Sequence, residues 1–324
     1  MYFYLAAFIF SLILTYLVRI IAIKKSIIDT PNERSSHTVP TPRGGGLAII
    51  VVWFAGLIYL FVNGQIEKQL FLALMSGIIL AVISLLDDIL DLKPAIRMLA
   101  QVITAAFAMG FLGGFNLLSE NQNTVIWLIS SIVVFIGIIW FINLFNFLDG
   151  IDAYASQEAI LVATGILLLT DNQLSALLIA ATAGFLIWNF PKAKIFMGDV
   201  GSTQLGFVLV VLGIYFHNTE SMNISNWLIL TSLFWFDATF TLYRRWRNNE
   251  QLSVAHKKHA YQRLVQGGFS HLKVDIYAVI LNILLIGIVY LNHYYLHQGI
   301  ILLIIVILVM FFINNRVDKV FKFK

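Results

Sequence analysis

The chain has 324 residues, of which 60% are hydrophobic and only 12% are charged, and it carries a formal net charge of +4. Its mean hydropathy is +0.86, and a soluble domain carries roughly twice this charged fraction, so the composition excludes a soluble globular protein and indicates an integral membrane protein. No cysteine is present, which excludes disulfides and thiolate metal sites. A hard cation such as magnesium, held on carboxylate oxygens, is then the expected kind of metal site.

The first apolar run extends from Tyr2 to Ile23. No basic residue precedes it and no small-residue cleavage site follows it, so we expect a first membrane span rather than a signal peptide. Lys24 and Lys25 follow at once. Basic residues at the end of a span favour the cytoplasm, so this end is predicted to lie there and the N-terminus outside.

The apolar segments predict an all-α polytopic membrane protein with about eleven spans, at 3–23, 46–62, 70–86, 95–113, 125–142, 157–170, 174–190, 203–216, 226–242, 274–292 and 299–313. The C-terminus then lies in the cytoplasm. All of the 21 Lys and Arg residues except Lys68 fall on the cytoplasmic side or at a helix end, as the positive-inside rule requires. We expect one domain, 1–324, with its functional residues on the cytoplasmic loops 24–46, 87–95, 143–156, 191–202 and 243–273.

An acidic cluster, Asp87, Asp88 and Asp91, ends the third predicted span. On a helix, Asp91 shares a face with each of the other two. Carboxylates this close repel one another unless a cation or a basic side chain compensates their charge. The cluster therefore indicates a functional site, and the alternative is a solvated helix end that Lys93 and Arg97 balance.

A second cluster places Asn146, Asp149 and Asp152 three residues apart, directly after a long apolar segment. This spacing predicts one helical stripe that recognises a metal–phosphate complex. Charge at the edge of a bilayer is costly unless it is used, which favours a functional interpretation. The alternative is that the two aspartates cap the helix that follows.

A third cluster centres on Asp199, which lies between Gly198 and Gly201. A carboxylate flanked by glycines offers an oxygen ligand and leaves room for a phosphate beside the backbone. The alternative is a turn with a capping Asp199 or Ser202. Phe196 is a candidate for stacking on a base, although a lone aromatic residue is more often an anchor at the membrane interface.

Two cytoplasmic loops are basic. The first has Arg43 beside Gly44–Gly46, where exposed amides would suit a phosphate; the alternative is a hinge for the next helix. The longest loop, 243–273, offers His256, His259 and several arginines, which suit a nucleotide diphosphate, whereas anionic lipid headgroups are the alternative partner. The two histidines have the spacing of zinc ligands but no third ligand nearby, so no zinc site is expected.

All these features fall on one predicted side of the membrane. Together they indicate magnesium-dependent phosphotransfer from a nucleotide-activated donor to a lipid phosphate, with no nucleic-acid partner. An aspartate-rich intramembrane prenyltransferase is an alternative, although such enzymes use repeated Asp-x-x-x-Asp motifs. A transporter of lipid-linked sugars would keep its charges near the membrane midplane, where Asp237 is the one acid well inside a predicted span.

The chain resembles the polyprenyl-phosphate N-acetylhexosamine-1-phosphate transferases, glycosyltransferase family 4. The resemblance rests on successive segments over nearly the whole chain: DTPNERSSH with PTPRGGG, LLDDILDL, NLFNFLDGIDA, FMGDVGS and HKKHAYQRL. It implies transfer of an N-acetylhexosamine or 6-deoxy-N-acetylhexosamine 1-phosphate from a UDP-sugar to undecaprenyl phosphate, with release of UMP. The reaction would start a lipid-linked cell-surface glycan at the cytoplasmic face of the bacterial inner membrane.

The same resemblance implies roles for individual residues. Asp87 and Asp88 match the catalytic pair, one of them a base, and Asp199 matches the magnesium ligand, with Asp152 beside it and Mn²⁺ as an alternative cation. The residues expected to bind substrate are Asn146, Asp149, Asp152, Arg43, His256 and His259. The lipid I enzyme has a triple-histidine run in the last loop, and this chain lacks it. The absence of that run is similar to the O-antigen-initiating (lipopolysaccharide) branch. Oligomeric state stays open, with a homodimer as one alternative.

Overall fold

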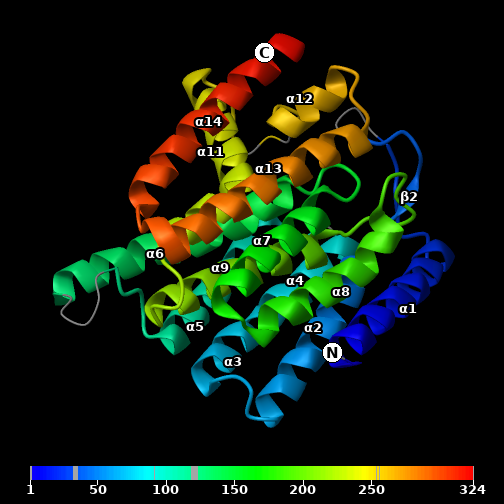
Figure 1. Ribbon diagram of the computed structural model, residues 1–324. Coiled ribbons are helices and arrows are strands. Elements are labelled where there is room, and N and C mark those ends of the chain that lie inside the picture. Colours follow the sequence, from blue (N-terminus) through cyan, green and yellow to red (C-terminus); the bar gives the residue numbers. More distant parts are fainter. Residues whose placement is uncertain are drawn as a thin grey trace.

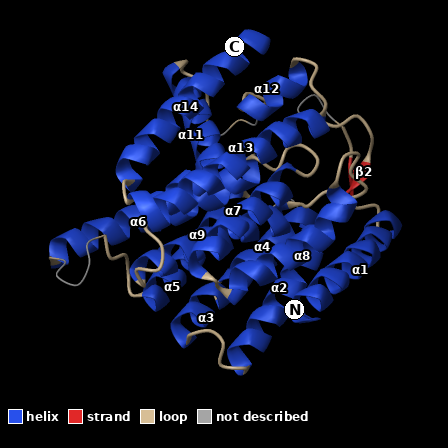
Figure 2. Ribbon diagram, viewed as in Figure 1, coloured by secondary structure: helices blue, strands red, loops and turns tan. Residues whose placement is uncertain are grey.

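The computed structural model describes residues 2–31, 36–90, 92–117, 123–252, 254 and 256–323. It is a bundle of helices with one very short antiparallel ribbon beside it (Figures 1 and 2). In chain order the elements are α1 (Tyr2–Lys24), β1 (Ile28–Asp29), β2 (Thr41–Pro42), α2 (Gly46–Val62), α3 (Lys68–Met75), α4 (Gly77–Leu90), α5 (Pro94–Leu112), α6 (Thr124–Phe147), α7 (Tyr154–Thr170), α8 (Gln173–Asn189), α9 (Asp199–Asn218), α10 (Ile224–Leu230), α11 (Ser232–Arg247), α12 (Ala260–Gln266), α13 (His271–Leu291), the π-helix η1 (Asn292–Leu296) and α14 (Gly299–Val320).

The helical class predicted from the composition is confirmed, and the chain is a multi-pass membrane protein. Within the described residues, seven segments are long and apolar enough to cross a bilayer: Tyr2–Lys24, Lys68–Leu90, Pro94–Leu112, Thr124–Phe147, Asp199–Asn218, His271–Leu296 and Gly299–Val320. The shorter apolar helices α2, α7 and α8 follow three further predicted ranges. The remaining predicted range, 226–242, falls on α10 and α11, which Thr231 separates. The number of spans and the side of each terminus stay predictions.

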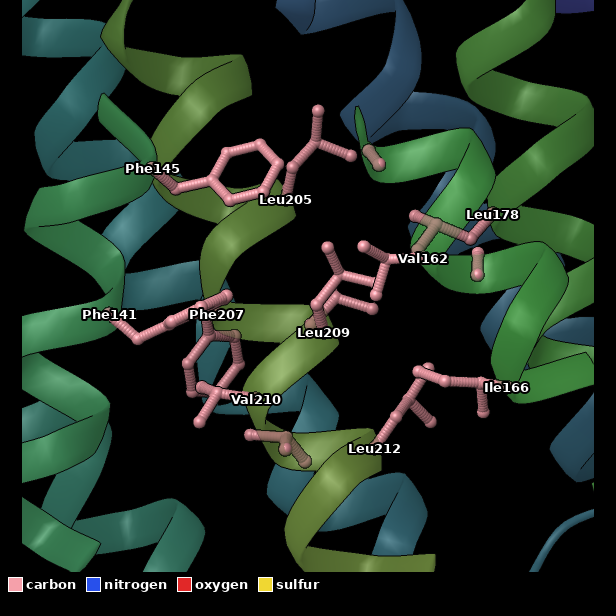
Figure 3. Packing of buried hydrophobic residues seen from close by; sticks show 14 of the residues in the cluster. Phe141, Phe145, Val162, Ile166, Leu178, Leu205, Phe207, Leu209, Val210 and Leu212 are labelled. Atoms are coloured by element: carbon pink, nitrogen blue, oxygen red, sulfur yellow. The ribbon is translucent and has the colours of Figure 1, made fainter. Parts of the chain in front are cut away.

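Helix α9 is the centre of the bundle, and 89% of its most apolar stretch is buried inside the protein. It packs against α2, α4, α6 and α7. Figure 3 shows Leu205, Phe207 and Leu209 of α9 between the side chains of α6 and α7. A helix that is apolar all round is expected in such a position. Because α9 begins at Asp199, the third acidic motif lies at the N-terminal end of the central helix.

The first turns of α2 and α9 lie in direct contact. A Cβ atom on Gly46 would lie 2.6 Å from the backbone nitrogen of Gly201, and one on Gly201 would lie 2.8 Å from Cα of Gly46. The N–H groups of Gly45 and Gly46 donate to the carbonyls of Phe196 and Met197, at 2.9 and 2.8 Å. The amides of Gly45 and Gly46 therefore already have backbone partners and are not available to a phosphate. The glycines are needed for the close approach of two backbones.

Candidate functional site

A cavity of about 730 Å³ lies where the acidic motifs meet. Its walls come from the loops before α2, between α6 and α7 and before α9, and from α12 and α13. The lining residues are Asp29, Ser36, His37, Arg43, Asn146, Asp149, Gly150, Ile151, Asp152, Asn189, Phe196, Met197, Gly198, Asp199, Gln262 and His271. The structure thus brings Arg43 together with the second and third acidic clusters, as predicted from the sequence.

Asp199 stands between an amide and two guanidinium groups. Arg43 Nη2 donates to its Oδ1 at 3.0 Å, and Asn146 Nδ2 donates to its Oδ2 at 3.3 Å. Arg97 Nη1 lies 3.7 Å from the same Oδ2. Ser202 Oγ donates to Asn146 Oδ1 at 2.9 Å, which fixes the amide so that its nitrogen faces the carboxylate. This is an anionic group with its counter-charges already in place, 18% exposed toward the cavity.

Asp88 caps α9. Its Oδ1 accepts a hydrogen bond from the Asp199 backbone N–H at 3.0 Å, and its Oδ2 accepts one from Val200 at 3.2 Å. Arg43 Nη2 lies 2.5 Å from Oδ1, and the Asp88 side chain is only 3% exposed. A carboxylate on the first amides of a helix satisfies donors that otherwise have no partner and favours the helix dipole. Asp88 therefore holds Asp199 in place, and it is not among the cavity-lining residues.

Asp87 is also engaged. Its Oδ2 accepts from Arg97 Nη1 at 3.0 Å and its Oδ1 accepts from the Leu92 N–H at 2.8 Å, with 4% of the side chain exposed. Asp91 lies outside the described residues, so its predicted shared face is not described. Arg97, interpreted from sequence as a charge-balancing residue, reaches both Asp87 and Asp199. In the sequence, Pro94 lies between Asp87 and Arg97. The short segment that this proline allows between two helices is the signal that could have placed Arg97 beside Asp87.

Asp149 and Asp152 reach the cavity from a loop. The predicted helical stripe is wrong beyond Asn146, because α6 ends at Phe147 and α7 begins at Tyr154. Burial, followed by the charge of Asp199, raises the pKa of Asp149 to about 7, so this carboxyl can exchange a proton near neutral pH.

The Asp152 carboxylate has protein partners of its own. Its Oδ2 accepts from the Ala193 N–H at 3.1 Å and lies 3.3 Å from His271 Nδ1. His271 received no role in the sequence interpretation, because it stands alone ahead of an apolar helix. It lines the cavity together with Asp152.

Gly150 leaves room for the Tyr261 side chain. The Tyr261 hydroxyl donates to the Phe147 carbonyl at 3.2 Å, and a Cβ atom on Gly150 would overlap that hydroxyl and approach Cζ to 3.1 Å. Tyr261 is buried and is absent from the cavity lining, whereas its neighbour Gln262 is present there. Of these two neighbours, only Gln262 is in a position to contact a ligand in the cavity.

Gly150→Ala is expected to lower kcat about 100-fold, since the loop carrying Asp149 must move by about an ångström. Adding Tyr261→Phe removes the overlapping hydroxyl, and the double variant should recover at least a tenth of the activity of the Tyr261→Phe protein. Initial rates of the purified single and double variants measure this. A double variant as inactive as Gly150→Ala would show that the contact with Tyr261 is not the reason for glycine.

His256 and His259 do not line the cavity. Their rings lie 4.8 Å apart, and His259 is 2% exposed at the N-cap of α12. Burial lowers the pKa of each to about 3, so both rings are neutral at physiological pH. The backbone N–H of His259 donates to Gln262 Oε1 at 3.3 Å, which places His259 behind a cavity residue. Their predicted contact with a diphosphate thus has no support in this geometry.

Asp237 holds the end of the long loop where α12 begins. From within α11, its two carboxylate oxygens accept from the Ala260 N–H at 2.9 and 3.0 Å, so it anchors the start of α12. Two arginines at the start of this segment are also engaged: Arg244 pairs with Asp318 and Arg245 pairs with Glu250. The one acid that the sequence placed well inside a span is therefore a structural anchor for the loop.

A magnesium ion fits this site only with help from the substrate. In the part of the chain that the structure describes, no three carboxylate or imidazole groups are placed to hold a metal. Magnesium usually takes one or two carboxylates together with waters and substrate phosphates. Asp199, beside the amide of Asn146 and facing the cavity, meets that requirement. Asp152 also lines the cavity, and its Oδ2 is shared with Ala193 and His271.

Comparison with known proteins agrees with this arrangement. Residues 70–217 match the model of glycosyl transferase family 4. The chain is 32% identical over 286 residues to a probable undecaprenyl-phosphate N-acetylglucosaminyl 1-phosphate transferase of Bacillus subtilis, covering 82% of this chain and 78% of that protein. It is 29% identical to the decaprenyl-phosphate N-acetylglucosaminephosphotransferase of Mycobacterium leprae (88% and 80% covered). It is 27% identical to the undecaprenyl-phosphate alpha-N-acetylglucosaminyl 1-phosphate transferase of Salmonella typhi (82% and 76% covered).

The family match begins in α3 and ends in α9, so it includes Asp87, Asp88, Asn146 and Asp199. The relatives extend the similarity over most of the chain. The motifs recognised in the sequence and the clustering of their side chains lead to the same assignment. The chain belongs to glycosyltransferase family 4, the superfamily of polyprenyl-phosphate N-acetylhexosamine-1-phosphate transferases.

Proposed function

We propose that this protein transfers N-acetylglucosamine 1-phosphate from a UDP-sugar to undecaprenyl phosphate, with release of UMP, at the cytoplasmic face of the bacterial inner membrane. The observation that carries the proposal is the Asp199–Arg43–Asn146 cluster, which opens into a cavity large enough for a ligand of this class. The names of the relatives support the sugar and the lipid acceptor. The basic residues of the flanking loops support the cytoplasmic side.

The walls of the 730 Å³ cavity offer partners for both the diphosphate and the base of the donor. Arg43 offers a planar guanidinium, which suits a diphosphate. At another wall, the rings of His37 and Phe196 lie 4.8 Å apart, edge to face, and both line the cavity. Such a wall suits a flat uracil base. Gln262, at the α12 side, is the residue we expect to meet the sugar.

Asp199 would hold the magnesium ion, with manganese as the alternative, and Asn146 would hold the Asp199 carboxylate in place. The ion would neutralise the diphosphate and so make UMP a better leaving group. In the reaction, an oxygen of the acceptor phosphate forms a bond to the phosphorus that carries the sugar, and the bond from that phosphorus to the UMP oxygen breaks. Asp88 and Asp87 hold Asp199 and Arg97 in place for this step.

An apolar groove of about 580 Å³ suits the polyprenyl chain of the acceptor. Its walls come from α6, α9, α10 and α11, and they include Gly137, Trp140, Phe141, Leu144, Val210, Trp227 and Trp235. Leu144 lies two residues before Asn146 on α6, so the groove and the polar site share one helix. A lipid seated there would bring its phosphate toward the Asp199 cluster from the bilayer.

The test is a reaction of purified protein with UDP-N-acetylglucosamine, undecaprenyl phosphate and magnesium, reading UMP and the mass of the lipid product. We expect both products, and a panel of other UDP-sugars, including 6-deoxy-N-acetylhexosamines, gives the donor range. If UMP is absent with every donor, the proposal is wrong. Diphosphate released from a prenyl diphosphate would identify the aspartate-rich prenyltransferase instead.

A further inference from the structure

One side chain joins three of the segments that surround the cavity. His271, at the start of α13, places Nδ1 at 3.3 Å from Oδ2 of Asp152 and at 3.4 Å from the Asp152 backbone nitrogen. Its Nε2 lies 3.2 Å from the Ser36 carbonyl in the loop before α2. Asp152 in turn accepts from the Ala193 N–H, in the loop before α9.

Both nitrogens of the ring are therefore used by protein groups. The ring is only 17% exposed, and the Asp152 carboxylate is 10% exposed. Because both nitrogens of the His271 ring have protein partners, neither is available to a reacting atom. What it does provide is a fixed distance between the loop of Ser36 and the loop of Asp152, because an imidazole is rigid and links the two through opposite edges.

The position of the Ser36 loop matters for the donor. His37 follows directly, and its ring packs on Phe196 in the cavity wall. Without the tie from His271, the Ser36–His37 segment would keep its link to Phe196 but would lose its anchor to α13 and Asp152. The donor would then meet a wall that is no longer held at one width.

We propose that His271 is a positioning residue for the nucleotide sugar, which it serves by holding the Ser36–His37 segment and Asp152 at a fixed separation. The proposal rests on the proposed function, since it says which of the two substrates, the nucleotide sugar, depends on this side chain for binding. The lipid acceptor, which we place in the groove beside α6, should not depend on it.

The test compares His271→Ala, His271→Asn and His271→Gln in the full-length protein. Asparagine keeps an amide near the Nδ1 position, and glutamine keeps one near Nε2, so each preserves one of the two links. Loss of a hydrogen bond to a charged group corresponds to about tenfold in affinity. We expect His271→Ala to raise the donor KM about tenfold, the amide variants to raise it less, and the acceptor KM to stay within about twofold. Lys273→Ala, on the same helix with its side chain over Phe269, is the matched control and should change neither.

Hydrogen exchange without substrate gives a second readout that does not need turnover. Amides of residues 36–45 should exchange faster in His271→Ala than in the wild type, whereas those of α9 should not. A wild-type protein that makes no lipid product would overturn the proposed function, and the exchange data would still decide the role of His271. Equal changes in both KM values, or unchanged exchange in residues 36–45, would overturn the positioning role.

Discussion

Asp199→Asn is expected to lower kcat by about 1000-fold while the protein still folds and inserts. The substitution keeps the shape of the side chain and its hydrogen bond partner Asn146, but it removes the charge that faces Arg43 and would hold the cation. Removal of one group that stabilises developing charge typically costs a factor of 10² to 10³. Initial rates at saturating magnesium, together with a thermal unfolding curve in detergent, measure the two effects separately.

Asp171→Asn is the matched control for this experiment. Asp171 is exposed at the end of α7 with a φ of 44°, a conformation that asparagine also adopts readily. Its activity should equal that of the wild type. Near-native turnover of Asp199→Asn at low magnesium would contradict the assignment of Asp199.

Asp88→Asn should lose both activity and stability, and the loss of stability is the informative result. Asparagine can accept from one of the two amides at the start of α9, but it cannot replace the ion pair with Arg43. We expect the free energy of unfolding to fall by about 2 kcal/mol, the range of a lost helix cap or an unpaired buried donor. Thermal unfolding of Asp88→Asn, beside the same Asp171→Asn control, provides the measurement.

A residue that acts only as a base on the acceptor phosphate would give a different result. Its substitution would remove turnover and leave the free energy of unfolding unchanged. An Asp88→Asn protein with full stability and no activity would therefore favour the base that the family resemblance implies over the capping role seen in the structure.

The sequence identified the helices well because the apolar segments are long and their ends are charged. It also identified the acidic motifs, since carboxylates that follow apolar segments at a membrane edge are costly unless used. It could not separate the roles of the neighbours Asp87 and Asp88. Asp87 binds Arg97 and Asp88 caps α9, and both contacts form only when α4, α5 and α9 pack together. Charge alone does not reveal such long-range partners.

Other parts of the site depended on packing that the sequence does not display. His256 and His259 looked like diphosphate ligands because they are polar and close together, yet neither lines the cavity, and His259 is buried beside the anchor that Asp237 provides for Ala260. His271 looked unremarkable, yet it reaches the cavity because α13 packs against α7. The amides of Gly45 and Gly46 looked free, but the backbone before α9 takes them.

The central position of α9 also sets the order in which the ribosome can complete the site. Four of the helices that pack against it, α2, α4, α6 and α7, precede it in the chain. Once α9 has left the ribosome, Asp199 and its partners Asp88, Arg43 and Asn146 are all available to pack together. The wall formed by Gln262 and His271 is made last, so chains truncated after α9 should contain the Asp199 cluster with its cavity open on the side where α12 and α13 would close it.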